Sequence, residues 1–318
     1  MSSKVQFVDI TESQDGQRID NFLIKTLKNL PRSRLYRIIR KGEVRVNKKR
    51  IKPEYKLQIG DRVRIPPVQL ETNEDAPIVI PQDLLNKVNK AILFENDSII
   101  ILNKPSGLAV HSGSGLRYGA IDVLRKLREK HDIELVHRLD RDTSGCLLFA
   151  KTRQGLLAMQ NLFKSQQLRK TYLAIVKGHW DESIKDIQLP LLKQTMSNGE
   201  RKVFVDDRGQ QAHTKIEEVT QFSKNGVDYS LLKIRLLTGR THQIRVHCKA
   251  QNHEIGGDQK YGDRPFNKLI KKISESRLLL HAVELEIPEN DHTKGLVIKA
   301  PEPGAFKQLT QNPIIEDK

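Results

Sequence analysis

The sequence contains little cysteine, few aromatic residues and no long apolar segment. Its 318 residues include two cysteines, Cys146 and Cys248. Both lie in apolar runs, which predicts buried free thiols rather than a disulfide. No stretch approaches the roughly 20 apolar residues of a membrane span, and the N-terminus lacks the apolar core of a signal peptide. We therefore expect a cytoplasmic protein in a reducing compartment, with no membrane partner.

Acidic residues are scarce relative to basic ones. The chain has 55 Lys and Arg against 39 Asp and Glu, a formal net charge of +16. Residues 15–70 alone hold 16 basic and 5 acidic residues, a net of +11. A solvated surface usually mixes charges of both signs, so this segment favours a polyanionic partner such as RNA.

Residues 15–70 are expected to form a compact unit. Asp20 is expected to cap a first helix, although an ion pair with Arg18 would also hold that helix start. Ser33 is expected to cap a second helix that stops at Gly42. The unit resembles the S4 domain, a small RNA-binding module, in its Asp-Gly-Gln-Arg-Ile-Asp, Ile-Ile-Arg-Lys-Gly and Val-Arg-Val-Asn stretches. The candidate RNA-binding residues in it are Arg32, Arg34, Arg37, Arg40, Lys41, Arg45, Lys48 and Lys49.

The rest of the chain predicts an α+β domain. Residues 71–88 contain Pro77 and Pro81 and are interpreted as a linker. Residues 89–312 are interpreted as one domain with a mixed, mostly antiparallel sheet and flanking helices, because long helices do not follow each strand. Residues 184–211 are expected to be irregular or a hairpin insertion. Strands are expected at 98–103, 146–151, 171–177, 229–237, 243–248 and 278–286, and helices at 120–130 and 153–165.

Isolated carboxylates precede one of the predicted buried strands. In HRLDRDTSGCLLFA, residues 137–150, Asp140 and Asp142 lie among arginines and are followed by Thr-Ser-Gly and an apolar run. A carboxylate at the entrance to a strand is held rigidly while its head group stays in a cleft. The alternative is that either aspartate only caps a turn.

A second segment provides a partner for such a carboxylate. In LLTGRTHQIRVHCKA, residues 236–250, alternation predicts a strand with Arg245 on the face opposite Ile244 and Val246. An arginine held in this way keeps a partly buried carboxylate ionised and oriented, which a carboxylate nucleophile requires. The histidines and Cys248 fit no common zinc spacing, so we expect no metal site.

Several motifs, in order, resemble the pseudouridine synthases of the RluA group. His137-Arg138-Leu139-Asp140 with Thr143-Ser144-Gly145 resembles their catalytic motif. Asn103-Lys104-Pro105-Ser106-Gly107 resembles the first motif, and Lys170-Thr171-Tyr172 the segment with the active-site tyrosine. The stretch from Gly239 to His247 resembles the third motif, and Gly257-Asp258 with Tyr261-Gly262 also fits.

The resemblance implies an RNA-modifying isomerase with the pseudouridine synthase fold and no cofactor or metal. It implies Asp140 as the nucleophile or nucleophilic assistant, Arg245 as its ion-pair partner and Tyr172 stacked on the target base. Arg138, Arg141, Lys104 and Arg240 are candidates for RNA contacts, although each would also suit an ion pair within the protein. The implied substrate is 23S rRNA, or the assembling large ribosomal subunit, at several uridines that include sites near the peptidyl transferase centre. We expect a monomer.

Three other functions are weighed against this one. A tRNA pseudouridine synthase would share the catalytic motifs. A non-catalytic RNA-binding factor in ribosome assembly would need only the basic N-terminal unit. A glycoside hydrolase would need a second well-placed acid and sugar-stacking aromatics, but aromatic residues make up only 5% of the chain.

Overall fold

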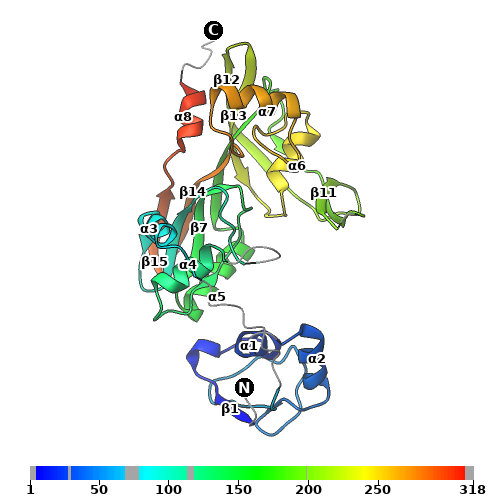
Figure 1. Ribbon diagram of the computed structural model, residues 1–318, viewed down its shortest axis with the longest axis vertical. Coiled ribbons are helices and arrows are strands. Elements are labelled where there is room, and N and C mark those ends of the chain that lie inside the picture. The colour runs from blue at the N-terminus through cyan, green and yellow to red at the C-terminus, as the bar shows by residue number, and fades with distance from the viewer. Residues whose placement is uncertain (1–4, 28–29, 69–78, 113–117, 198, 312–318) are drawn as a thin grey trace. The chain divides into compact units, whose positions relative to one another are not determined.

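The computed structural model describes residues 5–27, 30–68, 79–112, 118–197 and 199–311 (Figure 1). The chain divides into two compact units at the junction between Val79 and Ile80. The junction lies inside residues 71–88, which were expected to be a linker, and residues 71–78 of that segment lie outside the described residues. Its second half is not a linker, because helix α3 (Gln82–Lys90) begins after Pro81 and buries Leu85 and Val88.

The N-terminal unit is a small α/β domain. Its three-stranded antiparallel sheet has the order β1-β3-β2, and its core contains Ile19, Leu23, Leu35 and Val63. Basic residues alternate with these buried positions and therefore point to solvent. The elements are β1 (Gln6–Asp9), a 3-10 helix (Glu12–Gln14), α1 (Ile19–Thr26), α2 (Arg32–Arg40), β2 (Arg45–Val46) and β3 (Arg62–Ile65).

The starts of the two helices differ from the predicted caps. Asp20 lies in the first turn of α1, where its carboxylate accepts hydrogen bonds from the Arg18 guanidinium group at 2.7 and 3.1 Å. The internal ion pair considered from the sequence is thus present. Helix α2 begins one residue before Ser33, with Pro31 at the N-cap. Its predicted stop is confirmed, since Gly42 follows in the left-handed region with φ +70°.

The C-terminal unit is built on a ten-stranded mixed sheet. The strand order is β4-β5-β7-β14-β8-β13-β12-β9, with β6 paired to β7 and β15 to β14. Only the short β7–β14 pairing is parallel among the described strands, so the sheet is mostly antiparallel as predicted. The strands are β4 (Ile92–Glu95), β5 (Ile99–Lys104), β6 (Glu134–Leu135), β7 (Ser144–Ala150), β8 (Arg169–Lys177), β9 (Asp186–Ile187), β12 (Thr214–Lys224), β13 (Val227–Leu236), β14 (Leu280–Asn290) and β15 (Thr293–Lys299).

Helices cover both faces of this sheet. Ile99 and Ile101 of β5 pack in one cluster with Met159, whereas Ile100 and Leu102 pack in the other with Leu124. Burial on both faces explains the continuous apolar runs that the sequence shows in β5 and β7. Figure 1 shows α3 and α4 near one end of the sheet and α6 and α7 near the other. The remaining helices are α4 (Ala120–Leu127), α5 (Arg153–Lys164), α6 (Gln243–Ala250), α7 (Arg264–Ile273) and α8 (Gly304–Thr310).

One predicted element has the wrong type. Residues 243–248 form the start of helix α6, not a strand. All six of these residues are buried, so the segment has no polar face to reveal a helical period. The hairpin predicted within 184–211 is present as β10 (Leu191–Thr195) paired with β11 (Arg201–Val205).

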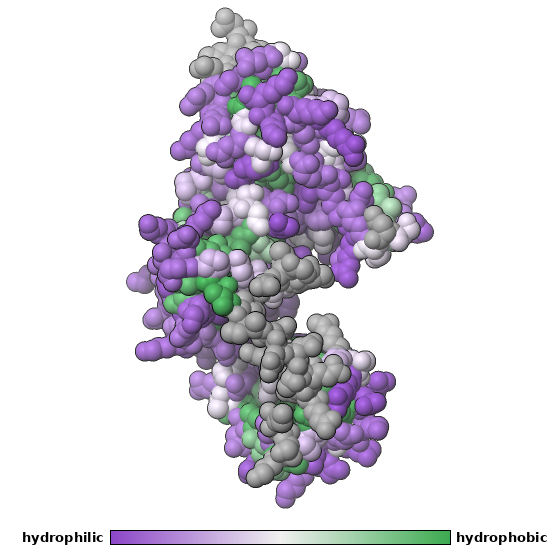
Figure 2. All heavy atoms as spheres, viewed as in Figure 1, coloured by the Kyte–Doolittle hydropathy of each residue, from purple (hydrophilic) through white to green (hydrophobic). Residues whose placement is uncertain are grey.

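Hydrophilic residues cover most of the face of the C-terminal unit that Figure 2 shows. Among the described residues, no helix is long and apolar enough to cross a membrane.

Candidate active site

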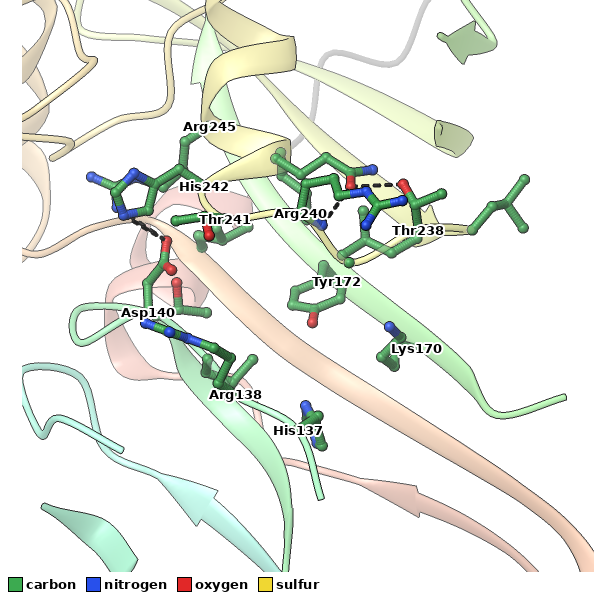
Figure 3. A pocket seen from close by; sticks show the side chains of 18 of the residues that line it. His137, Arg138, Asp140, Lys170, Tyr172, Thr238, Arg240, Thr241, His242 and Arg245 are labelled. Carbon is green, nitrogen blue, oxygen red and sulfur yellow. Dashed lines mark hydrogen bonds and ion pairs between the residues drawn. The ribbon is translucent and has the colours of Figure 1, made fainter. Parts of the chain in front are cut away.

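The C-terminal unit contains a cavity of about 540 Å³, and Figure 3 shows side chains that line it. Its wall is formed by the loop before β7, the start of β8 and the segment that joins β13 to α6. Among the described residues, five cationic side chains line it but only one carboxylate, that of Asp140. The cavity therefore suits an anionic ligand. The cations are those of Arg138, Lys164, Lys170, Arg240 and Arg245.

Asp140 lies in a loop that is tied to the segment after β5. The carbonyl of Arg141 accepts hydrogen bonds from Gly107 N–H at 3.0 Å and from the Lys104 ammonium group at 2.8 Å. The Ser106 hydroxyl donates to the carbonyl of Asp142 at 2.7 Å. The backbone directly after Asp140 is thus fixed, while 18% of the Asp140 side chain remains exposed to the cavity.

Arg245 lies in the first turn of α6 and binds two carboxylates. Its Nη1 donates to Oδ2 of Asp140 at 3.1 Å, while Nε and Nη2 donate to the two oxygens of Asp258 at 2.7 and 2.8 Å. Burial opposes ionisation of Asp258, but Arg245 and two backbone N–H groups lower its pKa below the usual value. Charge and orientation of the guanidinium are therefore fixed before any ligand binds. The predicted pairing of Asp140 with Arg245 is present, although a helix provides it.

His242 and Tyr261 complete the surroundings of Asp140. His242 has a left-handed backbone, φ +56°, at the N-cap of α6. Its Nε2 lies 3.8 Å from Oδ2 of Asp140, and its Nδ1 lies 2.7 Å from the Tyr261 hydroxyl. The Tyr261 ring also stacks under Arg245, 5.0 Å from its guanidinium carbon. The sequence alone indicates no role for His242, Asp258 or Tyr261.

Tyr172 projects into the cavity from β8 and lies between Asp140 and Lys170 in Figure 3. Only 6% of the residue is exposed. Burial, and then the negative charge of Asp140, raise the pKa of Tyr172 above its usual value. The phenol therefore stays protonated at neutral pH.

Lys170, which the sequence indicates only as part of the Lys170-Thr171-Tyr172 motif, also lines the cavity. It lies two residues before Tyr172 on β8, and its ammonium group sits 4.9 Å from the centre of the Phe163 ring. It makes no ion pair within the described part of the chain. Burial lowers its pKa to about 8, so most of it still carries a charge at pH 7. A cation without a carboxylate partner, facing a cavity, is available to an anionic ligand.

The structure contradicts the predicted RNA contact of Lys104. This residue is fully buried, and its ammonium group donates to the carbonyls of Pro105, Leu108 and Arg141 at 2.8 to 2.9 Å. These three bonds use all of its donors, and burial lowers its pKa to about 7. Lys104 therefore stabilises the loop that carries Asp140 and cannot reach a phosphate.

Most of the other predicted contact residues are exposed. Arg138 and Arg240 are exposed and line the cavity, whereas Arg141 is exposed and lines a neighbouring cavity of about 1150 Å³ that shares Asp140. In the N-terminal unit, the side chain of Arg32 lies outside the described residues and Arg34 is half-buried. The exposed predicted residues of that unit are Arg37, Arg40, Lys41, Arg45, Lys48 and Lys49.

Neither cysteines nor acids form a metal centre in the described ranges. No group of three or more His, Cys, Asp or Glu side chains is placed to hold an ion there. Cys146 and Cys248 are free and buried, as predicted.

Comparisons with known proteins place the chain in a family. Residues 98–250 match the family described as RNA pseudouridylate synthase, and residues 17–63 match the S4 domain. Ribosomal large subunit pseudouridine synthase C of Haemophilus influenzae is 49% identical over 92% of this chain and 91% of its own length. The proteins of that name from Vibrio cholerae and Escherichia coli K12 are 47% and 46% identical, over 94% and 96% of both chains.

Two solved human structures share the fold. RNA pseudouridylate synthase domain containing 4 aligns with a TM-score of 0.57 and 26% identity, over 71% of this chain and 94% of that one. RNA pseudouridylate synthase domain containing 1 gives a TM-score of 0.56 and 25% identity, over 67% and 83%.

Proposed function

Because the chain belongs to the RNA pseudouridylate synthase family, we propose that it isomerises specific uridines to pseudouridine in the 23S RNA of the large ribosomal subunit. The observation that carries this proposal is the carboxylate of Asp140, held by Arg245 at 3.1 Å in a cationic cavity beside Tyr172. The names of relatives that align over more than nine-tenths of the chain support the choice of substrate.

The reaction sets clear requirements for the site. The bond from ribose C1′ to N1 breaks and a bond from C1′ to C5 forms, while the base loses a proton at C5 and gains one at N1. Atoms and electrons balance within the nucleotide, so the chemistry calls for no redox, nucleotide or metal cofactor. It does call for a group that assists departure of the base from the ribose and for a pocket that keeps the detached base in place.

Asp140 meets the first requirement. Arg245 keeps its carboxylate oriented, and Oδ1 accepts no hydrogen bond from the residues that the structure describes. A fixed carboxylate oxygen with a free lone pair is suited to attack on C1′ or C6, or to removal of a ribose proton. Tyr172 meets the second requirement, because its ring offers a stacking surface for the detached base.

The target nucleotide must leave its stack to reach Asp140. Extruding a nucleotide costs a few kcal/mol, which contacts to phosphates and to the extruded base offset. The cavity cations Arg138, Lys170 and Arg240 and the exposed basic residues of the N-terminal unit are placed to make phosphate contacts. We propose that the chain acts in the cytoplasm as a monomer, on free 23S rRNA or on an assembling large subunit, at several uridines that include sites near the peptidyl transferase centre.

Tritium release tests the proposal directly. 23S rRNA transcripts labelled with tritium at uridine C5 are incubated with the protein, without cofactor, beside the Asp140→Asn variant. We expect release by the unmodified protein only, with equal RNA binding by both proteins. Release by Asp140→Asn at the unmodified rate would contradict the role of Asp140.

Two further labelled substrates test which RNA the protein modifies. Labelled tRNA tests for a tRNA synthase, and labelled large-subunit precursor particles test for a substrate that must be assembled. Failure to release tritium from any of the three, with RNA binding intact, would favour a non-catalytic RNA-binding factor.

A further inference from the structure

His242 has a left-handed backbone conformation, and this conformation affects the direction in which its imidazole ring points. It is one of six described non-glycine residues with a positive φ, and it lies at the N-cap of α6, three residues before Arg245. A left-handed conformation is uncommon for a non-glycine residue and persists where the surroundings enforce it. Here it turns the imidazole toward Asp140 (Figure 3).

The hydrogen bonds around Tyr261 determine which imidazole nitrogen carries the proton. The Tyr261 oxygen accepts from the backbone N–H of Val203 at 3.0 Å. Its own hydrogen needs an acceptor, because only 5% of the residue is exposed. Nδ1 of His242, at 2.7 Å, is the acceptor that the described residues offer. The Tyr261 O–H therefore donates to Nδ1, and the ring hydrogen of neutral His242 is on Nε2.

This tautomer directs an N–H at the carboxylate. Nε2 lies 3.8 Å from Oδ2 of Asp140, the same oxygen that accepts from Arg245 at 3.1 Å. A separation of 3.8 Å is too long for a hydrogen bond. Catalytic hydrogen bonds are often long in a free enzyme, however, and shorten when the substrate binds. Both donors approach Oδ2, which leaves Oδ1 as the reactive oxygen.

We propose that His242 is a positioning residue for Asp140, which in the RNA complex donates a hydrogen bond from Nε2–H to Oδ2 and so directs Oδ1 at the target nucleotide. The inference rests on the proposed isomerase activity and adds a role for Tyr261, which holds His242 in the donating tautomer. A neutral donor suits this position, because Arg245 already supplies a full positive charge. His242 keeps its proton throughout, so the step requires no acceptor for it.

Burial agrees with a neutral ring. Desolvation lowers the pKa of His242, an effect that the charge of Asp140 only partly reverses. Arg245 and Lys260 also disfavour the imidazolium. At neutral pH the group facing Oδ2 is thus an N–H donor without a net charge.

Two amide variants separate positioning from a purely structural role. In His242→Gln the side-chain amide nitrogen would lie near the place of Nε2, whereas in His242→Asn it would lie near Nδ1 and not reach Asp140. Asparagine also tolerates the left-handed backbone well, so His242→Asn should fold at least as well as His242→Gln. Both remove the imidazole and introduce the same neutral group.

The measurement is the single-turnover rate of tritium release from C5-labelled 23S rRNA, with the Kd for RNA measured in parallel. We expect His242→Asn to lower the rate about 10- to 100-fold, the value of one hydrogen bond to a charged group. We expect His242→Gln to stay within about threefold of the unmodified protein, and the Kd to stay unchanged in both.

Equal rates for the two variants would overturn the proposal. Nitrogen-15 NMR of histidine-labelled protein gives an independent check, with His242→Gln used to assign the signal. A proton on Nδ1 instead of Nε2 would also overturn it. If the unmodified protein itself releases no tritium, the proposed activity fails and not this inference alone.

Discussion

Asp140 and Arg245 meet at 3.1 Å although 105 positions separate them in the sequence. The arginine reaches this contact with its other two donor nitrogens already bound to Asp258. Asp258 thus fixes the guanidinium, and the guanidinium fixes Asp140. The carboxylate of Asp140 is thus oriented through a chain of two ion pairs, Asp258–Arg245 and Arg245–Asp140.

Replacement of Arg245 should separate stability from catalysis. Arg245→Met removes the partner of a buried carboxylate, which typically costs about 3–5 kcal/mol. Arg245→Lys restores the charge but not the two-pronged contact with Asp258. We expect the lysine variant to recover part of the stability and to remain at least about tenfold slower in tritium release.

Urea unfolding followed by Trp180 fluorescence measures the stability of these variants. Trp180 is the only tryptophan and is 1% exposed in the C-terminal unit, so the signal reports on the unit that contains the site. Full activity of Arg245→Lys would show that the charge alone suffices and that the geometry of the contact does not matter.

The sequence predicted the sheet better than the helix that carries Arg245. The ends of strands β5, β7, β8 and β13 lie within two residues of their predicted positions, because continuous apolar runs and alternation indicate buried strands. Residues 243–248 fit alternation equally well. Their complete burial removed the polar face that would have indicated a helix, and Arg245 and His247 are buried through ion pairs and hydrogen bonds that local patterns cannot show.

The site was predictable only in part, because local sequence patterns do not show contacts between distant segments. Asp140, Tyr172 and Arg245 were named from motifs, and the structure brings them to one cavity. Lys104 looked like another basic contact, since nothing in its neighbours indicates that three carbonyls converge on its ammonium group. Asp258 and Tyr261 act on Asp140 through Arg245 and His242, so their roles appear only once distant segments are placed together.

Lys170 should contribute to RNA affinity through charge. Lys170→Gln removes a cavity cation that has no carboxylate partner among the described residues, so we expect weaker RNA binding and a salt slope smaller by about 1. The measurement is Kd for a 23S rRNA fragment across a series of salt concentrations. Lys170→Arg keeps the charge and serves as the control, with an expected slope equal to that of the unmodified protein. An unchanged slope for Lys170→Gln would exclude a phosphate contact.

His281 should make the C-terminal unit sensitive to acid. It is 1% exposed, and burial lowers its pKa from 6.5 to about 4. Between these values the unfolded chain binds a proton that the folded chain does not. The stability present above pH 6.5 is therefore lost as pH falls toward 4, by up to about 1.4 kcal/mol per pH unit for this one group.

A variant isolates the contribution of His281. The side-chain amide of asparagine can donate or accept in place of Nδ1 of His281, which shares a hydrogen bond of 2.7 Å with the Ser144 hydroxyl, and it does not titrate. We expect His281→Asn to flatten the decline of unfolding free energy between pH 6.5 and 4, as measured by urea unfolding with Trp180 fluorescence. His131→Gln alters an exposed histidine and should leave the decline unchanged. Identical pH profiles for His281→Asn and the unmodified protein would show that His281 does not carry this linkage.

The exposed cations of α2 should bind RNA as local contacts and not only through net charge. A variant with Arg37→Gln, Arg40→Gln and Lys41→Gln removes three exposed charges from the N-terminal unit. Loss of three phosphate contacts should reduce the salt slope of RNA binding by about 2 to 3, because each contact contributes about 0.7 to 0.9. The changes are on the surface, so the stability of the unit should change little.

A second variant with the same net charge separates local contact from overall attraction. Lys268→Gln, Lys271→Gln and Lys272→Gln neutralise three exposed lysines of α7 in the C-terminal unit. If α2 contacts the RNA, its variant lowers the slope by clearly more than the α7 variant does. Equal reductions in the two would mean that the net charge of the chain attracts RNA without a specific docking surface on α2. In that case the net charge of +11 on residues 15–70 would raise the rate at which the protein encounters RNA, but it would not stabilise the bound complex.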